Sequence, residues 1–216
     1  SPGLRVDGPP AEPLVRTPNG PREGADPEEI IRGFMHAGAT SGEGLEVTRS
    51  FLTDDQARGW IPDSQTIVYA GTSPKITKVS GSGQTYRVRV RVLATIDAVG
   101  RYTVAPPNLW EDVDFSMTKV KGEWRIDALE EGFGRLLQKD EVDVIFGDYF
   151  VHYPAIGWNA LVVDRRWFPQ DQLATRVARA QLGNIPEYLA DAVSSYLFNA
   201  QLVTLPEGDG MALILP

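Results

Sequence analysis

The residues of this sequence that could do chemistry are few and widely spaced. The chain has no cysteine and only two histidines, His36 and His152. The lack of cysteine excludes disulfides, zinc–thiolate sites and thiol nucleophiles together. Acid–base catalysis or metal binding by a histidine needs a partner within reach, and neither histidine has another histidine or a paired carboxylate nearby in the sequence. We therefore interpret both histidines as structural and expect no metal and no cofactor.

Three carboxylates are the remaining candidates for catalysis. Asp114 and Asp127 fall on strand faces opposite the apolar stripes, so solvent exposure explains them. Asp97 interrupts the apolar stretch LATIDAV and is the best single candidate for a buried carboxylate. The sequence contains no nucleophile elbow, phosphate-binding loop or HExxH motif. We therefore expect a protein that is not an enzyme.

Three arginines stand out on this acidic chain. Arg87, Arg89 and Arg91 alternate with valines, so a strand would place all three on one exposed face. They could form a solvated face paired with cross-strand carboxylates such as Asp112 and Asp114. They could also form a docking surface for an acidic partner, because complementary charge speeds encounter and suppresses wrong partners. The second interpretation makes these arginines the candidate partner-binding residues.

A second candidate surface is the segment WNALVVDRRW, from Trp158 to Trp167. Its two indoles and two arginines are residue types enriched in binding hot spots. Core packing accounts for at least one of the tryptophans, so both interpretations stay open.

The arginines and carboxylates need strands to position them, and the sequence predicts these strands clearly. Residues 110–129 form two alternating arms joined by Lys121-Gly122, the pattern of a β-hairpin with one buried face. A long alternating run over residues 85–99 precedes the hairpin. Two shorter strands, TIVYA and KITKVS, are predicted before that run, separated by residues 71–74.

Helices are predicted ahead of the strands. Asp26 is a suitable N-cap, Pro27 fits the first helical position, and the apolar stripe that follows ends at Gly38. A second helical stretch over residues 45–60 restarts near Thr53. Helices followed by a run of antiparallel strands predict an α+β fold, with a curved sheet wrapped over helices.

The chain divides into three parts in this interpretation. Residues 1–25 hold six prolines and four glycines and are predicted to be an extended tether. A linker is placed at about residues 130–141. The second unit is predicted to contain a strand over 142–151, a strand over 160–168, a helix starting at Pro169, a helix over 185–199 and two final strands. We expect this second unit to be incomplete, because its last strand stops at Pro216.

The composition limits the possible partners. A net charge of −8 argues against non-specific binding to nucleic acid or to an anionic bilayer, since both attract basic proteins. No apolar run approaches the roughly 18 residues needed to span a bilayer, so we expect a soluble chain.

The order of these pieces resembles the N-terminal part of the LpqB family of actinobacterial lipoproteins. The first half is similar to the family's NTF2-like domain, a cone-shaped α+β fold, and the second to the start of a GerMN domain. This resemblance sets the domains at 1–25 (tether), 26–140 (NTF2-like) and 141–216 (GerMN-like). The segments that show it are DPEEIIRGFMHA, SFLTDDQARGW, GEWRID, VIFGDYFV and VVDRRWFPQDQLATRVARAQL.

The resemblance implies a non-enzymatic, extracytoplasmic protein, held at the cell membrane by a lipidated N-terminal cysteine. It also implies a partner, the extracytoplasmic domain of a sensor histidine kinase of the MtrA–MtrB two-component system. The family's lipidated cysteine and C-terminal β-propeller are not in this sequence, and AQLGNIP stands where GerMN domains usually have Leu-Leu-Xaa-Gly-Pro. We therefore expect a soluble fragment of a cell-envelope adaptor, with a GerMN-like domain that departs from its pattern.

Two rival functions are kept. One is a small-ligand module that uses the cone as a pocket for lipid or cell-wall fragments, and the other is a cone-fold isomerase or dehydratase. An apolar cavity lined by Tyr86, Trp124 and Phe115, with a buried Asp97, would favour the rivals. A filled cone would favour the adaptor.

Overall fold

The largest element of the fold is a six-stranded sheet, and the predicted α+β class is confirmed. The computed structural model describes residues 18–42, 44–81, 83–171, 173–182, 185–194, 201–204 and 211–214. The strands of the sheet are β1 (Gln65–Lys78), β2 (Thr85–Asp97), β3 (Tyr102–Val104), β4 (Trp110–Val120), β5 (Glu123–Ala128) and β6 (Arg135–Gln138). Their order is β5–β4–β2–β1–β6, with β3 also paired to β2. The pairs are antiparallel except β1 with β6, which is parallel.

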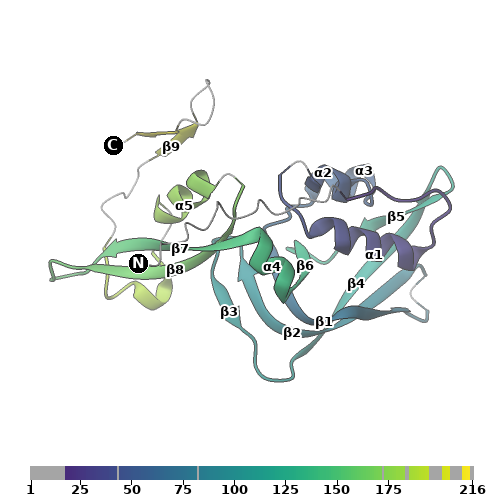
Figure 1. The fold of residues 1–216 in the computed structure, drawn as a ribbon, viewed down its shortest axis with the longest axis horizontal. Helices are drawn as coiled ribbons and strands as arrows, with labels where there is room; N and C mark the ends of the chain where they lie inside the picture. The colour runs from purple at the N-terminus through teal and green to yellow at the C-terminus, as the bar shows by residue number, and fades with distance from the viewer. Residues whose placement is uncertain are drawn as a thin grey trace, which may run out of the picture.

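Three helices cover one face of this sheet (Figure 1). They are α1 (Pro27–Gly38), α2 (Gly44–Arg49) and α3 (Asp54–Gly59). α1 begins as predicted, with a capping box in which Asp26 and Glu29 each accept a hydrogen bond from the other's backbone N–H. The Thr53 side chain caps α3, which confirms the predicted restart.

The space between the helices and the sheet is filled by aromatic side chains. The ring centroids of Phe34 and Trp60 lie 5.4 Å apart, those of Phe34 and Phe115 6.2 Å, and those of Phe115 and Phe133 5.8 Å. These separations are typical of packed aromatic pairs. The buried indole of Trp60 also donates a 2.8 Å hydrogen bond to the Gly134 carbonyl oxygen.

The predicted break between two short strands is a bulge within one strand. β1 pairs with β2 on both sides of residues 71–74, with Ala70 opposite Arg91 and Lys75 opposite Arg89. Gly71 has a φ of +95°, which lets the backbone leave and rejoin the ladder. The prediction of two separate strands is therefore wrong, because residues 71–74 interrupt the pairing without ending the strand.

The predicted linker at 130–141 is wrong. Residues 135–138 form β6, and Leu136 and Leu137 are buried beside β1. Glycine and charged residues on either side favour a linker in the sequence. The strand between them is only four residues long, and its buried residues Leu136 and Leu137 complete the sheet. The next residues form α4 (Lys139–Ile145), so the strand predicted over 142–151 begins only at Phe146.

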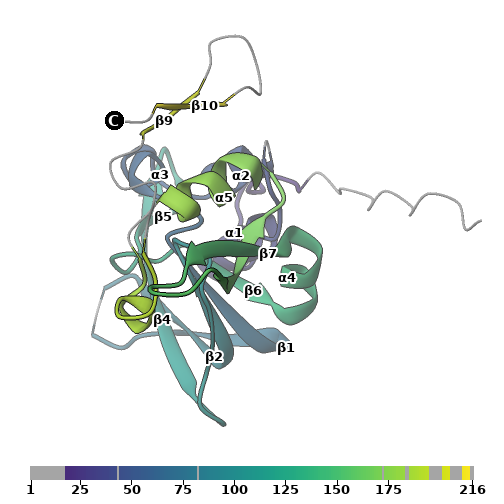
Figure 2. The same cartoon turned by 90° about the vertical axis from the view of Figure 1, so that its left-hand side faces the viewer.

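The second region is built on a hairpin of β7 (Phe146–Pro154) and β8 (Leu161–Pro169). Helix α5 (Leu173–Leu182) lies against it in both views (Figures 1 and 2). Pro169 is therefore the last residue of a strand and not the start of a helix. The apolar face of α5 is only partly buried, and its residues are Leu173, Val177, Ala180 and Leu182.

The helix predicted over 185–199 is wrong in its described part. Residues 187–189 form a short 3₁₀ turn, η1 (Glu187–Leu189), preceded by Pro186. Val193 then bridges Ala155 in an extended conformation, which a continuous helix could not provide. Residues 195–199 lie outside the described part of the chain.

The two predicted final strands form a separate pair, β9 (Gln201–Thr204) with β10 (Met211–Ile214). Of the predicted tether, residues 1–17 lie outside the described residues. The remainder touches the fold, because the Gly24 N–H donates a 2.9 Å hydrogen bond to Glu123 and Ala25 is buried.

The hairpin region is joined to the sheet through an apolar cluster that includes Phe146 and Trp167, through polar contacts and through one aromatic pair. The Trp167 N–H donates to the Gly100 carbonyl oxygen at 2.7 Å, and the rings of Tyr102 and Trp167 lie 5.3 Å apart. Asp63 pairs with both Arg135 of β6 and Arg176 of α5. A division of the chain into two domains near residue 140 stays a prediction.

Candidate functional site

The three candidate arginines lie on the face of the sheet that is turned away from the helices. Along β2, Val88 and Val90 are buried against the helices, while Arg87 is half-buried and Arg89 and Arg91 are exposed on the other side. Successive side chains of a strand point to opposite faces, which is why a simple alternation produces this row. The structure therefore brings the three arginines together as predicted.

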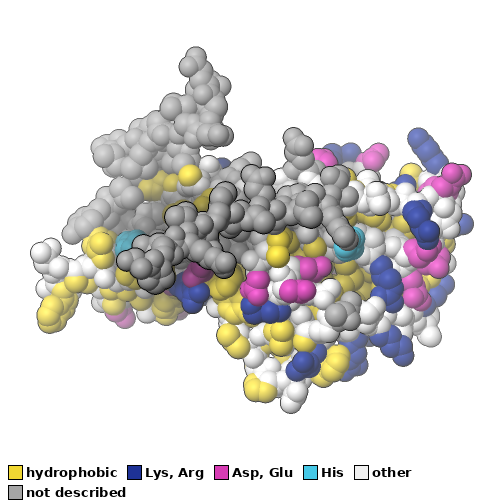
Figure 3. Space-filling model, viewed as in Figure 1, with side chains coloured by type: hydrophobic (Ala, Val, Ile, Leu, Met, Phe, Trp, Pro, Cys, Tyr) yellow, Lys and Arg dark blue, Asp and Glu magenta, His cyan; other side chains and the backbone are white. Residues whose placement is uncertain are grey.

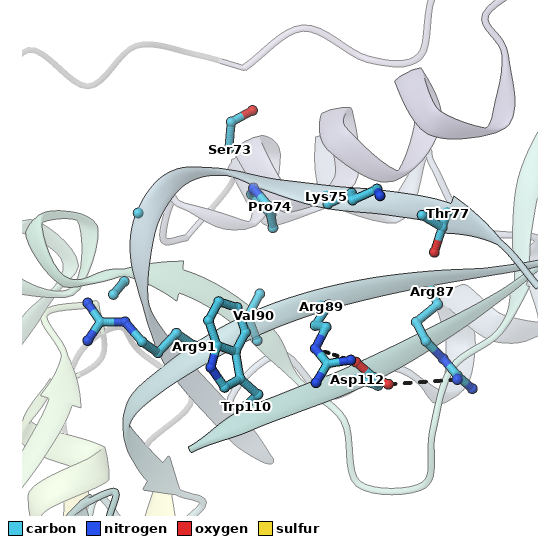
Figure 4. A pocket seen from close by; sticks show the side chains of 12 residues that line it. Ser73, Pro74, Lys75, Thr77, Arg87, Arg89, Val90, Arg91, Trp110 and Asp112 are labelled. Carbon is cyan, nitrogen blue, oxygen red and sulfur yellow. Dashed lines mark ion pairs between the residues drawn. The ribbon is translucent and has the colours of Figure 1, made fainter. Parts of the chain in front are cut away.

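Carboxylates of β4 lie directly across from the first two arginines. Arg87 pairs with Asp114 and Arg89 with Asp112 in the register of the strands. Arg87 donates two 2.7 Å hydrogen bonds to Asp114, and its N–O distance to Asp112 is 3.7 Å. Arg89 also lies 3.7 Å from Asp112 (Figure 4). The predicted cross-strand pairing is thus confirmed.

This pairing shifts the acid–base properties of one pair. The hydrogen bond from Arg87 lowers the pKa of Asp114, and the same bond raises the pKa of Arg87. Both groups therefore stay charged at neutral pH. Because both side chains remain substantially exposed, solvent screening leaves the pair little effect on stability.

The other end of the row is less compensated. Within the described residues, Arg91 has no carboxylate at ion-pairing distance. Its cross-strand neighbour is Trp110, which is 53% exposed. The guanidinium of Arg89 lies 5.8 Å from the centre of the Trp110 ring, a cation–π arrangement. An exposed indole beside unpaired positive charge is a combination enriched in binding sites.

The β1 bulge turns this row into a groove. The cavity there has a volume of about 660 Å³, with the bulge and Lys75 on one side and the arginines and Trp110 on the other (Figure 4). Arg32 of α1 fixes the bulge by donating 3.3 Å hydrogen bonds to the Ser73 hydroxyl and the Pro74 carbonyl oxygen. Figure 3 shows Lys and Arg side chains gathered over this part of the molecule, where Figure 1 places β1 and β2.

Sequence reasoning missed two parts of the groove. The sequence places Lys75 in a separate strand, because residues 71–74 have the composition of a break between strands. Trp110 was identified only as the start of a hairpin. Trp110 precedes Asp112 by two residues and Asp114 by four, so the alternation of the strand already puts all three side chains on one face. The alternation therefore predicts that Trp110 lies on the same face of the sheet as the arginines.

The three candidate catalytic carboxylates do not converge. Asp114 is paired with Arg87, and Asp127 is exposed on β5. Asp97 is half-buried at the end of β2, where it accepts hydrogen bonds from the backbone N–H groups of Val99 and Arg101. The expected buried carboxylate is therefore wrong, since Asp97 orders a turn.

The two histidines lie on different elements. His36 is exposed near the end of α1, beside a small cavity of about 170 Å³ that Tyr69 and Glu141 also line. Burial raises the pKa of Glu141 and raises that of Tyr69 to about 12. His152 is exposed on β7. Across the described residues, no three His, Cys, Asp or Glu side chains are grouped so that they could hold a metal ion.

The segment from Trp158 to Trp167 is split by the fold. Trp158 is 79% exposed at the end of the hairpin, whereas Trp167 packs on Tyr102. Arg165 is exposed and pairs with Asp148, but Arg166 is buried and pairs with Asp164. The prediction that core packing accounts for at least one tryptophan is confirmed, and the four residues do not form one surface.

The fold and the groove together define an α+β protein in which the helical face of the sheet is packed and the charged groove is on the opposite face. The chain belongs to the LpqB lipoprotein family, since residues 20–143 match the family model described as lipoprotein LpqB, N-terminal domain. No solved structure matches the chain significantly.

Curated relatives agree with this assignment. The chain is 30% identical over 187 residues to lipoprotein LpqB of Bifidobacterium longum, covering 82% of this chain and 32% of that protein. It is also 30% identical over 187 residues to lipoprotein LpqB of Thermobifida fusca, covering 82% of this chain and 30% of that protein. It is 33% identical over 117 residues to lipoprotein LpqB of Streptomyces coelicolor, covering 52% of this chain and 19% of that protein. The chain thus spans at most about a third of the length of these relatives. In the part of the chain that the structure describes, no helix is long and apolar enough to cross a membrane.

Proposed function

We propose that this chain is the N-terminal part of a cell-envelope lipoprotein that works by binding another protein and not by catalysis. The proposed partner is the extracytoplasmic domain of a sensor histidine kinase of the MtrA–MtrB type. Family membership supports the envelope setting, because the relatives are named lipoproteins. Binding would change signalling only if the lipoprotein preferred one state of the kinase over the other.

The observation that supports binding most directly is the groove lined by Arg87, Arg89, Arg91, Lys75 and Trp110. It lies on the solvent side of a rigid sheet, and part of its positive charge has no carboxylate partner among the described residues. An acidic segment of a partner could pair with that charge while covering the indole. Such complementarity raises the association rate and selects the partner against wrong ones.

The rival functions place a ligand between the helices and the sheet. Phe115, which was expected to line such a cavity, is fully buried and packs edge-on against Phe34 and Phe133. Tyr86 and Trp124 are partly buried and pack against the same apolar cluster. This packing supports the adaptor over a module that holds its ligand inside the cone.

The test is a calorimetric titration of this chain with the extracytoplasmic domain of the kinase. We expect Arg89→Glu together with Arg91→Glu to weaken binding at least tenfold, because both side chains are exposed in the groove and their charges would be reversed. Binding should also weaken as salt is added, since exposed charges are screened.

The matched control reverses the charges of two exposed lysines where β4 turns into β5, at the opposite end of β4 from Trp110. This double variant is Lys119→Glu together with Lys121→Glu. It changes the net charge by the same amount and should leave the affinity within about twofold, because screening weakens long-range charge effects. Equal losses for the two double variants would refute the groove as the binding site. No heat from the unmodified chain at tens of micromolar would refute the partner.

A further inference from the structure

A second cavity lies where the hairpin region meets the sheet, away from the groove described above. It has a volume of about 420 Å³ and is enclosed by the turn after β2, the β7–β8 hairpin and α5. This volume is within the range of small-molecule sites. Four arginines line it, and they come from three separate segments: Arg101, Arg166, Arg176 and Arg179.

Two of the four arginines are neutralised by carboxylates. Arg166 donates a 2.7 Å hydrogen bond to Asp164 and a 2.9 Å hydrogen bond to the Val99 carbonyl oxygen. Arg176 lies 2.7 Å from Asp63 and 3.5 Å from Asp171. These two guanidinium groups are therefore fixed in place, and their charges are compensated by the protein.

The other two arginines are not compensated. Within the described residues, neither Arg101 nor Arg179 has a carboxylate at ion-pairing distance. The guanidinium of Arg101 stacks on Tyr188 at 4.9 Å, and its buried Nε atom has no hydrogen-bond partner in the described part of the chain. Like charges that converge on a partly enclosed cavity repel one another, and a bound anion would relieve this repulsion.

A tyrosine with a buried hydroxyl also lines this cavity. Tyr153 is 1% exposed and lines the cavity beside Arg166. Its hydroxyl makes no hydrogen bond of ordinary geometry to any described residue. Burial raises the pKa of Tyr153, so the group keeps its proton at neutral pH and can act as a donor. Buried polar groups are usually hydrogen-bonded in folded proteins, so this free hydroxyl is available to a ligand.

The remaining wall is apolar, with Phe168 and Pro186 among its residues. The volume corresponds to about fourteen water molecules at roughly 30 Å³ each, far more than a bare oxyanion would fill. The cavity therefore suits a molecule with a charged end and an apolar body.

We propose that this cavity binds a small organic oxyanion, a carboxylate or a phosphate monoester. Arg101, Arg179 and the Tyr153 hydroxyl bind the charged group, and the apolar wall around Phe168 contacts the rest of the molecule. Arg166 and Arg176, whose charges are already paired, line the cavity from fixed positions. The site would be independent of the groove on the sheet.

The test measures the thermal unfolding midpoint of the whole chain with phenyl phosphate, benzoate, inorganic phosphate and the neutral probe benzyl alcohol. Sodium chloride at matched ionic strength is the reference. We expect at least one organic anion to raise the midpoint saturably, by more than inorganic phosphate or benzyl alcohol does, because a ligand that binds the folded state stabilises it. The stronger of the two organic anions identifies the oxyanion.

Variants then locate the site. Arg179→Gln changes an exposed residue and should weaken the stronger probe at least fivefold without loss of folding; Arg101→Gln and Tyr153→Phe should each weaken it as well. The control is Arg165→Gln, next to Arg166 in sequence but exposed and paired with Asp148. It should leave the affinity unchanged. An unchanged affinity in Arg179→Gln, an equal loss in Arg165→Gln, or no shift beyond that of sodium chloride would overturn the proposal.

Discussion

The six-stranded sheet and the hairpin region bury their residues by different means. The sheet and its helices share one continuous apolar cluster that includes Phe34, Trp60 and Phe115. The hairpin region has only three fully buried residues in its own cluster, Val151, Tyr153 and Val193. Phe146 and Trp167 join a second apolar cluster with the sheet, several ion pairs lie in the same interior, and hydrophobic side chains lie exposed toward the end of the hairpin (Figure 3). The helix-covered face of the sheet is thus stabilised by apolar area, whereas the hairpin region combines smaller apolar clusters with buried charges that depend on their partners.

Arg135 of β6 lies where the packed sheet meets the ion pairs of the hairpin region. Its side chain is 1% exposed, donates a 2.8 Å hydrogen bond to the Thr40 carbonyl oxygen and pairs with Asp63. Burial lowers the pKa of Arg135, while Asp63 acts in the opposite direction. A buried ion is stable only while its partner remains, so Asp63 supports both the buried Arg135 and the contact that it makes with Arg176 of α5.

The largest effect is expected inside the sheet. Phe115→Ala removes a ring that packs on Phe34 and Phe133, and it should lower the free energy of unfolding by about 3–5 kcal/mol. Urea unfolding measures this loss. Trp158→Ala is the control in the hairpin region, and its 79% exposed ring should cost less than about 0.5 kcal/mol. Similar losses for both would remove the contrast between the regions.

The next effect tests the link. Asp63→Ala leaves the buried Arg135 guanidinium without its carboxylate and should lower the free energy of unfolding by about 3 kcal/mol. Asp55→Ala removes an exposed ion pair with Arg58 and should cost less than about 1 kcal/mol. Amide exchange should also accelerate in α5, because Asp63 binds Arg176. Unchanged exchange in α5 would show that Asp63 does not couple the regions.

A smaller loss of stability is expected at Gly100, where a steric contact with β8 adds to the backbone strain of a positive φ. A Cβ atom at Gly100 would lie 2.6 Å from the Phe168 ring and 2.8 Å from the Trp167 carbonyl oxygen, at a φ of +79°. Gly122 has a similar φ of +90° with open space around it. Gly100→Ala should therefore cost about 1–2 kcal/mol more than Gly122→Ala, as measured by urea unfolding. Equal losses of stability for the two alanine variants would mean that β8 and the turn at Gly100 can move apart at little energetic cost.

The smallest effect is a pH dependence near the junction. Burial raises the pKa of Glu141 above its value in the unfolded chain. Its contribution to stability is therefore fully present below the unfolded pKa of about 4.3 and is lost as the pH rises through the folded pKa. Compared with Glu141→Gln, the unmodified chain should gain stability when the pH is lowered from neutral toward that value.

Unfolding at several pH values measures this difference. The exposed Glu131→Gln should show no comparable trend. A gap between the unmodified chain and Glu141→Gln that stays constant with pH would contradict the prediction.

Local signals in the sequence predicted much of the sheet region. The Asp26 cap and the alternating strands depend on neighbours in the chain, and the pairing of the β2 arginines with Asp112 and Asp114 depends on the antiparallel register of β2 with β4. The sequence does not predict β6, because four residues are too short to show a periodic pattern. These residues form a strand because they pair with the free edge of β1. The helix expected over 185–199 failed because tertiary pairing of Val193 with Ala155 outweighs local propensity.

The same reasoning explains what was found at the two sites. The arginine row lies on a single strand, so alternation revealed it. The four arginines of the second cavity come from three segments of the chain. No spacing in the sequence can indicate such a cluster, because it exists only once the hairpin has docked on the sheet.

The parallel pairing of β1 with β6 has a consequence for the newly made chain. β1 begins at Gln65, but the strand that covers its outer edge is the last of the sheet to leave the ribosome. Until Gln138 has been made, β1 offers unpaired backbone N–H and C=O groups beside Ile67 and Val68, and exposed edges of this kind promote association between chains. A product that ends before Arg135 would keep that edge open, so translation past β6 protects the nascent sheet.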